Sequence, residues 1–373
     1  MRSKTFCVRC RTSPNQKCSG HLPSGHRGKG VPSVPFVKPF VLCLLLAVTA
    51  YGQKNPPTAK AARLEAFPPD SDERREMTRV QILLDQANFR PGKIDGMGGE
   101  FTQRAADRYA LVHGLPPGSL LDTGSIPEPY TTHTVTEEDL KWVGPTASTP
   151  PEQAKLKRMP YASVWEAVAE MYHCDLRFLK DLNPGLSDPE PGTVLRVPNV
   201  APFRMSDVEA LAKKRNGEAL ARKAAEKAGE PGPPAPTPSH RLVLLRDQRI
   251  LEVYDLEDKL VASFPCTPGS SAIPVPEGTW KVVNNVLLPT FRYDKSVLKS
   301  GVPSDEAYLI PPGPNNYVGI VWMGINRRSV GMHGTNHPDQ IGRNQSSGCI
   351  RLANWDAFLL CQMAVKGTPL EVR

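Results

Sequence analysis

A cysteine and a histidine near the end of the chain have the surroundings of a nucleophilic pair. A thiol attacks as its thiolate, so Cys349 needs a base, and His333 could take its proton and return it to a leaving amine. Gly348 lets the backbone approach a bound carbonyl, so the amides around Gly348 and Cys349 could hold an oxyanion. The planar guanidinium of Arg351 could hold a substrate carboxylate or amide.

Spacing alone leaves a plainer interpretation open for both residues. A cysteine beside a strand is commonly a buried structural residue, and a single histidine commonly lies in a core or on a surface. Cys7-x2-Cys10 and Cys18-x2-His21 have the spacing of a zinc knuckle, but they lie in a stretch without apolar periodicity that would be removed with the export signal. The sequence shows no other cluster with metal-ligand spacing and no phosphate-binding loop, so we expect no metal and no cofactor.

Two motifs place the pair in a family context. His333-Gly334-Thr335 is followed by Ser346-x-Gly348-Cys349-x-Arg351, and this order resembles the signature of the L,D-transpeptidase (YkuD) family. The resemblance extends across residues 240–373. It includes three further runs, at 267–269, 274–280 and 310–316.

The resemblance implies a β-rich domain whose cysteine attacks the peptide bond after meso-diaminopimelate in a tetrapeptide stem. The enzyme releases D-alanine and passes the acyl group to an amine. Carried over by residue, Cys349 is the nucleophile and His333 the base, and the carbonyl of Gly334 orients the imidazole ring.

The remaining motif residues receive supporting roles from the same resemblance. Ser347 and Gly348 belong to the catalytic loop, and Ser346, Thr335 and Arg351 contribute to substrate binding. Many members have a histidine at the position of Ser347 that is thought to help the oxyanion hole, whereas others have serine. The oxyanion donors here are then mainly backbone amides. His337 lies outside the motif, and we interpret it as a loop residue that could face the substrate.

Short, evenly spaced apolar segments must position these residues. They predict a mainly antiparallel β-sandwich or barrel over residues 240–373. The expected strands are 240–245, 249–254, 260–264, 278–283 and 318–323. One late helix is expected over 354–364, with an inward face formed by Trp355, Phe358, Leu359 and Met363.

Residues 76–118 predict a small helical domain. A helix with an apolar stripe leads into the turn 89–96, and Thr102 is expected to cap a second helix that ends near Gly114. The order resembles the helical peptidoglycan-binding domain PG_binding_1, with its third helix short or lost beyond Leu115. The matching residues are Val80, Gln81, Leu84, Phe89, Pro91, Gly92, Asp95, Gly96, Thr102 and Ala105.

Residues 130–199 predict a strand, two helices and a second strand. The expected elements are 132–136, 161–172, 175–184 and 191–198, with a Pro-rich insertion after the first. This order, together with the Leu-Asn-Pro at 182–184, resembles a LysM glycan-binding module. The alternative is a spacer of the same βααβ order that does not bind glycan.

Two segments have linker composition. Residues 53–75 are rich in Pro, Ala and charge, and residues 200–239 begin as a charged helix over 208–228 and end in a proline-rich stretch. The chain has 39 prolines among 373 residues, about twice average usage, which predicts small modules held apart from the catalytic domain.

The net charge is concentrated at the N-terminus. The chain has 46 Lys+Arg and 38 Asp+Glu, for a charge of +8, and residues 1–52 alone hold eight basic and no acidic side chains. The apolar run 39–50 is too short to span a bilayer but suits a signal-peptide core, with cleavage before Gln53. We therefore expect export to the periplasm or cell envelope, with an uncleaved anchor as the alternative. The neutral remainder predicts no nucleic-acid partner and no stable membrane span.

Four cysteines follow residue 52, at 174, 266, 349 and 361. They could form two disulfides, or one could be reactive and the others buried. The leading functional hypothesis is a secreted L,D-transpeptidase that acts on peptidoglycan stem peptides, with glycan strands as a binding partner and a stem or an envelope protein as acyl acceptor. The alternatives are an L,D-carboxypeptidase of the same fold and an inactive wall-binding protein.

Overall fold

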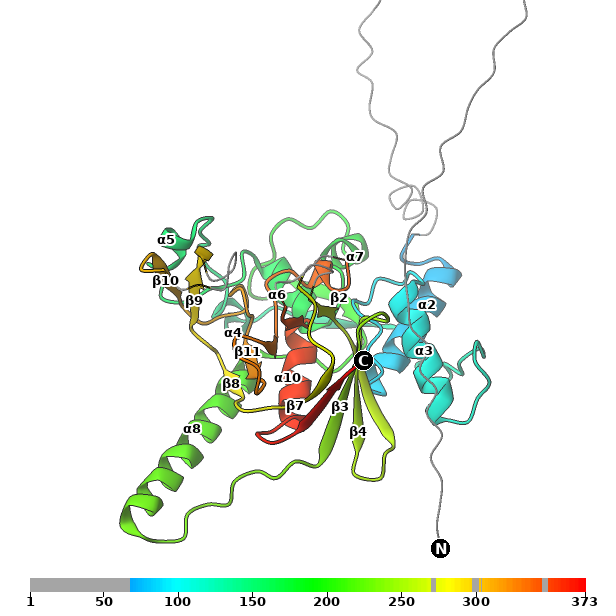
Figure 1. Ribbon diagram of the computed structural model, residues 1–373. Helices are drawn as coiled ribbons and strands as arrows, with labels where there is room; N and C mark the ends of the chain where they lie inside the picture. Colours follow the sequence, from blue (N-terminus) through cyan, green and yellow to red (C-terminus); the bar gives the residue numbers. More distant parts are fainter. Residues whose placement is uncertain (1–67, 270–272, 297–301, 303, 344–347) are drawn as a thin grey trace, which may run out of the picture. The chain divides into compact units, whose positions relative to one another are not determined.

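The computed structural model describes residues 68–269, 273–296, 302, 304–343 and 348–373 (Figure 1). The expected export segment 1–52 and most of the segment 53–75 lie outside the described residues. Within the described ranges, no helix combines the length and the apolar character that crossing a bilayer requires.

Residues 240–373 contain two five-stranded sheets. Their strand orders are β5-β4-β3-β14-β7 and β6-β13-β12-β11-β8, and β9 pairs with β10 in a separate hairpin. Neighbouring strands are antiparallel except in the pairs β14–β3 and β12–β13, so the expected mainly antiparallel β domain is confirmed. The strands are β3 His240–Leu245, β4 Ile250–Asp255, β5 Leu260–Pro265, β6 Thr267–Pro268, β7 Gly278–Lys281, β8 Val286–Leu287, β9 Phe291–Asp294, β10 Ala307–Ile310, β11 Val321–Gly324, β12 Gly331–His333, β13 Ile350–Arg351 and β14 Pro369–Val372.

The late helix α10, Asn354–Met363, packs against β11 and β12 and is drawn in red in Figure 1. Its expected inward face is only partly right. Trp355 is buried, but Phe358, Leu359 and Met363 are half-buried at the margin of the core. The helix instead buries Asn354, Asp356, Ala357, Leu360 and Cys361, because other parts of the chain also cover it.

The helical unit consists of α2, Asp72–Gln86, and α3, Glu100–Val112. Thr102 does not cap α3, because the helix begins at Glu100 and its N-cap is Gly99. Thr102 is buried inside the helix, where its hydroxyl accepts a hydrogen bond from Gln81 Nε2 at 3.4 Å. The prediction of a Thr cap was therefore wrong by one helical turn.

The next unit has the expected strand–helix–helix–strand order. Strands β1, Tyr130–Thr134, and β2, Val194–Pro198, pair antiparallel. The helices α6, Val164–Met171, and α7, Leu176–Leu182, lie between them in sequence and are capped by Ser163 and Asp175. The insertion holds two four-residue helices, α4 Glu137–Leu140 and α5 Pro150–Gln153. We call residues 130–199 the βααβ unit.

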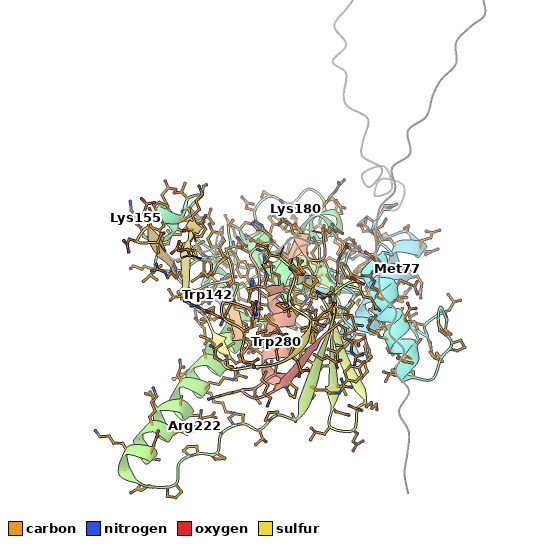
Figure 2. The ribbon with its side chains drawn as sticks, in the orientation of Figure 1. Met77, Trp142, Lys155, Lys180, Arg222 and Trp280 are labelled. Carbon is orange, nitrogen blue, oxygen red and sulfur yellow. The ribbon has the colours of Figure 1, made fainter. Side chains whose placement is uncertain are left out.

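The units are not held apart as the linker composition predicted. All described residues belong to one compact unit. Trp142 of the βααβ unit, labelled in Figure 2, is buried in the same core as β3, β4 and β14. The helix α8, Met205–Ala228, is also part of that core, because Met205 and Val208 are buried in it. The rest of the segment, residues 229–239, is exposed.

Candidate active site

Strand pairing brings the predicted catalytic residues onto one face of a sheet. β12 and β13 run parallel, with His333 opposite Arg351 and Met332 opposite Ile350. Because side chains alternate along a strand, Cys349 shares the face of His333 and Arg351. Met332 and Ile350 are fully buried on the other face, in the core. Local strand geometry therefore separates the polar residues from the apolar ones.

This face opens into a cavity of about 720 Å³ that contains most of the predicted site. Ser346 and Ser347 lie outside the described residues. The described residues that line the cavity are Ile273, Pro274, Pro276, Phe291, Arg292, Asp294, Tyr317, Val318, Trp322, Arg327, Arg328, Ser329, Val330, His333, Thr335, Asn336, His337, Gly348, Cys349 and Arg351.

The imidazole of His333 is held in one tautomer. Its Nδ1 lies 2.6 Å from the carbonyl oxygen of Gly334, which can only accept, so Nδ1 carries the hydrogen and Nε2 is left as an acceptor. The ring of Trp322, on β11, stacks on it with centroids 5.6 Å apart. Burial, with a smaller contribution from the charge of Arg351, lowers the pKa of His333 to about 4. The imidazole is therefore neutral at physiological pH and able to act as a base.

The thiol of Cys349 is half-buried and faces a tight turn. Its Sγ lies 3.7 Å from the carbonyl oxygen of Ser329, a residue whose φ of 61° is in the left-handed region. Burial raises the pKa of the Cys349 thiol, and a backbone contact with Gly331 and the charge of Arg351 oppose the rise. The thiol and the imidazole are thus both neutral at rest, so an attack by Cys349 would need a base to take the thiol proton.

Gly348 has the conformation that its position requires. Its φ of 91° strongly favours glycine, and an added Cβ would lie 3.2 Å from Cγ2 of Ile273. The carbonyl of Cys349 accepts a hydrogen bond from Gly269 at 3.2 Å, which fixes the backbone on the other side of the thiol. These contacts hold the amides of Gly348 and Cys349 in a defined place next to the cavity.

Arg351 and Thr335 differ in how available they are to a ligand. The buried Nε of Arg351 has no hydrogen-bond partner in the part of the chain that the structure describes. Thr335 lines the cavity, but its hydroxyl accepts a hydrogen bond from the backbone of His337 at 3.1 Å. Its first role is therefore to shape the loop. His337 itself lines both this cavity and a neighbouring one of about 490 Å³.

The other three cysteines of the described part are buried free thiols. Burial raises the pKa of Cys174 and Cys266, and it raises the pKa of Cys361 to about 11. Of the two possibilities that the sequence left open, the structure favours one accessible thiol with buried companions. Cys349 is the only one of these four that lines the 720 Å³ cavity.

Sequence reasoning missed Trp322 and Asp294. Trp322 alternates with buried residues along β11, a pattern that could have placed it on the face of the site. Asp294 is buried at the cavity wall, where its carboxylate accepts hydrogen bonds from Ser304 N at 2.8 Å and Ser296 N at 3.0 Å. It anchors the β9–β10 hairpin beside the cavity, and no motif marked it.

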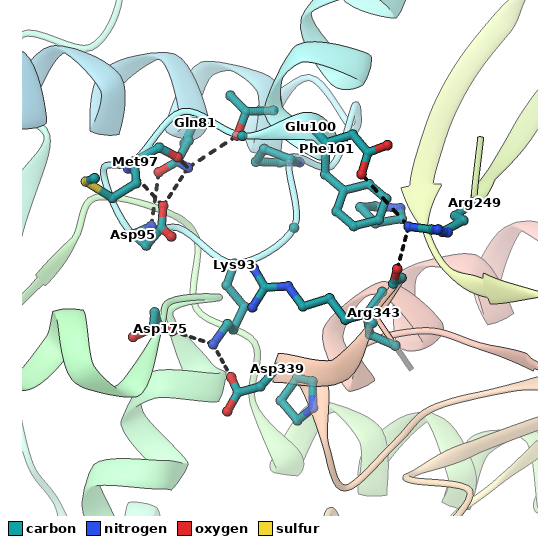
Figure 3. Close-up of a pocket in the computed structure, with 18 residues that line it drawn as sticks. Gln81, Lys93, Asp95, Met97, Glu100, Phe101, Asp175, Arg249, Asp339 and Arg343 are labelled. Atoms are coloured by element: carbon teal, nitrogen blue, oxygen red, sulfur yellow. Dashed lines mark hydrogen bonds and ion pairs between the residues drawn. The ribbon is translucent and has the colours of Figure 1, made fainter. Parts of the chain in front are cut away.

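The helical unit forms part of a separate cavity of about 430 Å³ (Figure 3). The side chain of Gln81 bonds both to the carboxylate of Asp95, at 3.0 Å, and to the amide of Gly96, at 2.8 Å, and so holds the predicted Asp-Gly turn. Lys93 bridges Asp175 of the βααβ unit and Asp339 of the loop that follows His333. Residues of three units thus meet at this cavity.

A half-buried thiol and a neutral histidine of fixed tautomer thus line one cavity, an arrangement suited to nucleophilic chemistry. Residues 239–372 match the family model of the L,D-transpeptidase catalytic domain, YkuD. The matched segment makes up about a third of the chain.

Individual proteins are similar to part of this chain. The protein YkuD of Bacillus licheniformis, whose name provisionally classes it as an L,D-transpeptidase, is 27% identical over 133 residues, covering 36% of this chain and 65% of that protein. The YkuD protein of Bacillus subtilis, with the same provisional name, is 32% identical over 95 residues, covering 24% and 56%. A solved L,D-transpeptidase from Mycobacterium smegmatis has 22% identity and a TM-score of 0.30, covering 36% of this chain and 58% of that one. Each match spans less than two thirds of the relative.

Proposed function

We propose that this protein is an L,D-transpeptidase that acts on peptidoglycan stem peptides through a thioester on Cys349. The observation that carries the proposal is the placement of His333, at the end of β12, and Cys349, directly before the parallel neighbouring strand β13, so that both line one cavity within a segment that matches the family. The substrate class comes from that family, and the steps below are derived from the residues.

In the first step, Sγ of Cys349 attacks the carbonyl carbon of the bond after the third stem residue while Nε2 of His333 takes the thiol proton. The backbone amides at Gly348 and Cys349 support the oxyanion. Collapse breaks the peptide bond, and His333 returns the proton to the departing amine of D-alanine. An acceptor amine then attacks the thioester, loses its proton to His333, and the thiol forms again.

The charge of the cavity suits a stem peptide. Four arginines and one aspartate line it, and Asp294 already binds Ser304, Ser296 and Arg292. The remaining positive charge matches the carboxylates of a stem peptide, and Arg351 presents its unpartnered buried Nε beside the thiol. This supports an anionic acyl donor.

The proposal is tested by incubating the full chain with defined tetrapeptide muropeptides and weighing the products. We expect cross-linked dimers and free D-alanine from the wild type and none from Cys349→Ala. Cys361→Ala, which removes a buried thiol away from the cavity, is the matched control and should retain product formation. Tripeptides without dimers would replace the proposal with a carboxypeptidase, and no product at all would contradict it.

We further propose that residues 1–52 direct export and are removed. The eight basic side chains followed by the apolar run 39–50 support this proposal. Expression of the full sequence with a C-terminal tag should give an envelope-associated product whose mass begins at Gln53. A full-length product retained in the cytoplasm would contradict it.

We also propose that the two upstream units bind the wall, on the resemblances of residues 76–118 and 130–199. The full chain carrying Cys349→Ala should pellet with purified sacculi without turnover. Displacement by N-acetylglucosamine oligomers would support glycan binding by the βααβ unit, and displacement by stem peptides would support the helical unit. Failure to pellet would contradict both.

A further inference from the structure

A buried carboxyl group of the βααβ unit, that of Glu170, contacts a residue of the catalytic domain. Glu170 lies on α6 and is 7% exposed. Its Oε1 accepts hydrogen bonds from Asn354 Nδ2 at 2.9 Å and from the hydroxyl of Tyr161 at 2.8 Å. Burial, only partly opposed by these two donors, raises the pKa of Glu170 to about 8, so the group is mostly protonated at neutral pH.

Asn354 connects this carboxyl group to the backbone behind the site. It is fully buried as the first residue of α10. Its Nδ2 also donates to the carbonyl of Pro314 at 3.1 Å, and its Oδ1 accepts from the amide of Ile320 at 3.3 Å. Nδ2 faces two acceptors, on Glu170 and Pro314, and Oδ1 faces one donor, the amide of Ile320. The side-chain amide of Asn354 therefore has a single orientation that satisfies all three groups.

The side-chain amide of Asn354 is in close contact with Gly334, the residue after His333. A Cβ on Gly334 would lie 2.2 Å from Asn354 Oδ1, so the side chain and the backbone of Gly334 are in close contact. The carbonyl of Gly334 accepts the hydrogen bond from His333 Nδ1 at 2.6 Å. A continuous set of contacts therefore runs from Glu170 through Asn354 and Gly334 to the imidazole.

We propose that Glu170 is a positioning residue for His333, acting from outside the segment that matches the YkuD family. By accepting from Nδ2, Glu170 holds the amide of Asn354 in the orientation that supports the Gly334 carbonyl. That carbonyl keeps the hydrogen on Nδ1 and leaves Nε2 free to receive the thiol proton. The βααβ unit is then part of the catalytic apparatus as well as a wall-binding candidate. The effect on turnover rests on the proposed function, whereas the effect on the tautomer does not.

The test compares Glu170→Leu with Glu170→Gln in the full chain. Glutamine keeps a carbonyl oxygen that can accept from Asn354 and Tyr161, so this variant should behave like the wild type. Leucine has similar bulk and no acceptor, so the amide of Asn354 loses one partner. We expect Glu170→Leu to lower kcat by about 10–100-fold, with KM changed less than about threefold. Tyr161→Phe, which removes only the other donor to Glu170, is the matched control and should keep kcat within about threefold.

A second readout follows the histidine directly. In nitrogen-15-labelled protein, His333 of the wild type and of Glu170→Gln should show the Nδ1–H tautomer, and Glu170→Leu should show a mixture of tautomers. If Glu170→Leu does not fold, Glu170→Asp withdraws the carboxyl from Asn354 by one methylene and is measured in the same way. An unchanged tautomer and an unchanged kcat in a folded variant would overturn the inference. A wild type that gives no turnover but shows the tautomer change would contradict the proposed function and leave the positioning role supported.

Discussion

The two upstream units contact the catalytic domain in different ways. The helical unit covers an open sheet edge: Arg90 N donates to the carbonyl of Ser263 on β5 at 2.8 Å, and Ser263 N donates to Asn88 at 3.0 Å. Charged pairs such as Arg108 with Glu252, at 2.7 Å, complete this contact. None of these five residues is among the described residues that line the Cys349 cavity.

The βααβ unit instead shares the main hydrophobic core. Tyr161 and Ala167 are buried together with catalytic-domain side chains, and Glu170 bonds to Asn354 behind the catalytic histidine. The helical unit therefore stabilises the fold by covering β5, whereas the βααβ unit also supports the residues around His333. Variants at the first contact should change stability alone, whereas loss of the hydrogen bond between Glu170 and Asn354 should also change turnover.

The largest expected effect is at Arg90, which is 8% exposed and lies 2.5 Å from Asp85 and 3.6 Å from Asp356. Arg90→Met removes the cation between two buried carboxyl groups and should lower the free energy of unfolding by about 4 kcal/mol. Urea denaturation measures this change. The kcat of the folded fraction should stay within about twofold, and a large loss of kcat at unchanged stability would break the comparison.

A smaller loss is expected at Arg108, whose guanidinium binds both Glu252 and Gln248. Arg108→Met removes the cation that faces the buried Glu252, whose carboxylate still accepts a hydrogen bond from Tyr254, and should cost about 3 kcal/mol of stability, again without a change in kcat. Adding Glu252→Leu removes the unpaired charge and should recover part of the loss. If the double variant is less stable than Arg108→Met, the charge pair does not explain the contact.

The protonation of the site can be tested through pH. The pKa of His333 is lowered to about 4 and that of Cys349 is raised, so both groups are neutral between pH 5 and 8. Alkylation of Cys349 by iodoacetamide should therefore rise about tenfold per pH unit from pH 6 to beyond pH 9. A constant rate between pH 5 and 8 would indicate a preformed thiolate–imidazolium pair instead. Cys349→Ala shows how much label reaches other thiols.

The smallest effect is expected from Tyr161→Phe. The hydroxyl of Tyr161 donates to Glu170, which keeps Asn354 as a second donor when the hydroxyl is removed. The loss of one buried hydrogen bond should cost about 1 kcal/mol in thermal or urea unfolding. A loss above about 3 kcal/mol would show that this hydroxyl, and not Asn354, is the main partner of Glu170.

Local patterns predicted the parts of the molecule that depend on local physics. Short apolar runs located β3, β4 and β5, because each strand has three or more consecutive buried positions. The contact between His333 and the Gly334 carbonyl followed from the motif, because it joins adjacent residues.

Contacts between segments that are distant in the sequence could not be predicted from local patterns. Glu170 looked like an ordinary charge on an amphipathic helix, and only the fold brings it to Asn354, which is 184 positions away. For residues 200–239 the composition gave a wrong prediction: charge and proline predicted a spacer, whereas Met205 and Val208 are buried in the core. A few buried side chains outweigh the average character of a segment.

The most direct test of the central claim is the mass of the intact protein after rapid mixing with a tetrapeptide stem and an acid quench. The account predicts an adduct on Cys349 equal to the stem without its terminal D-alanine, formed by the wild type and by Cys361→Ala but not by Cys349→Ala. No adduct on the wild type, or an adduct that persists in Cys349→Ala, would contradict a thioester mechanism at this site.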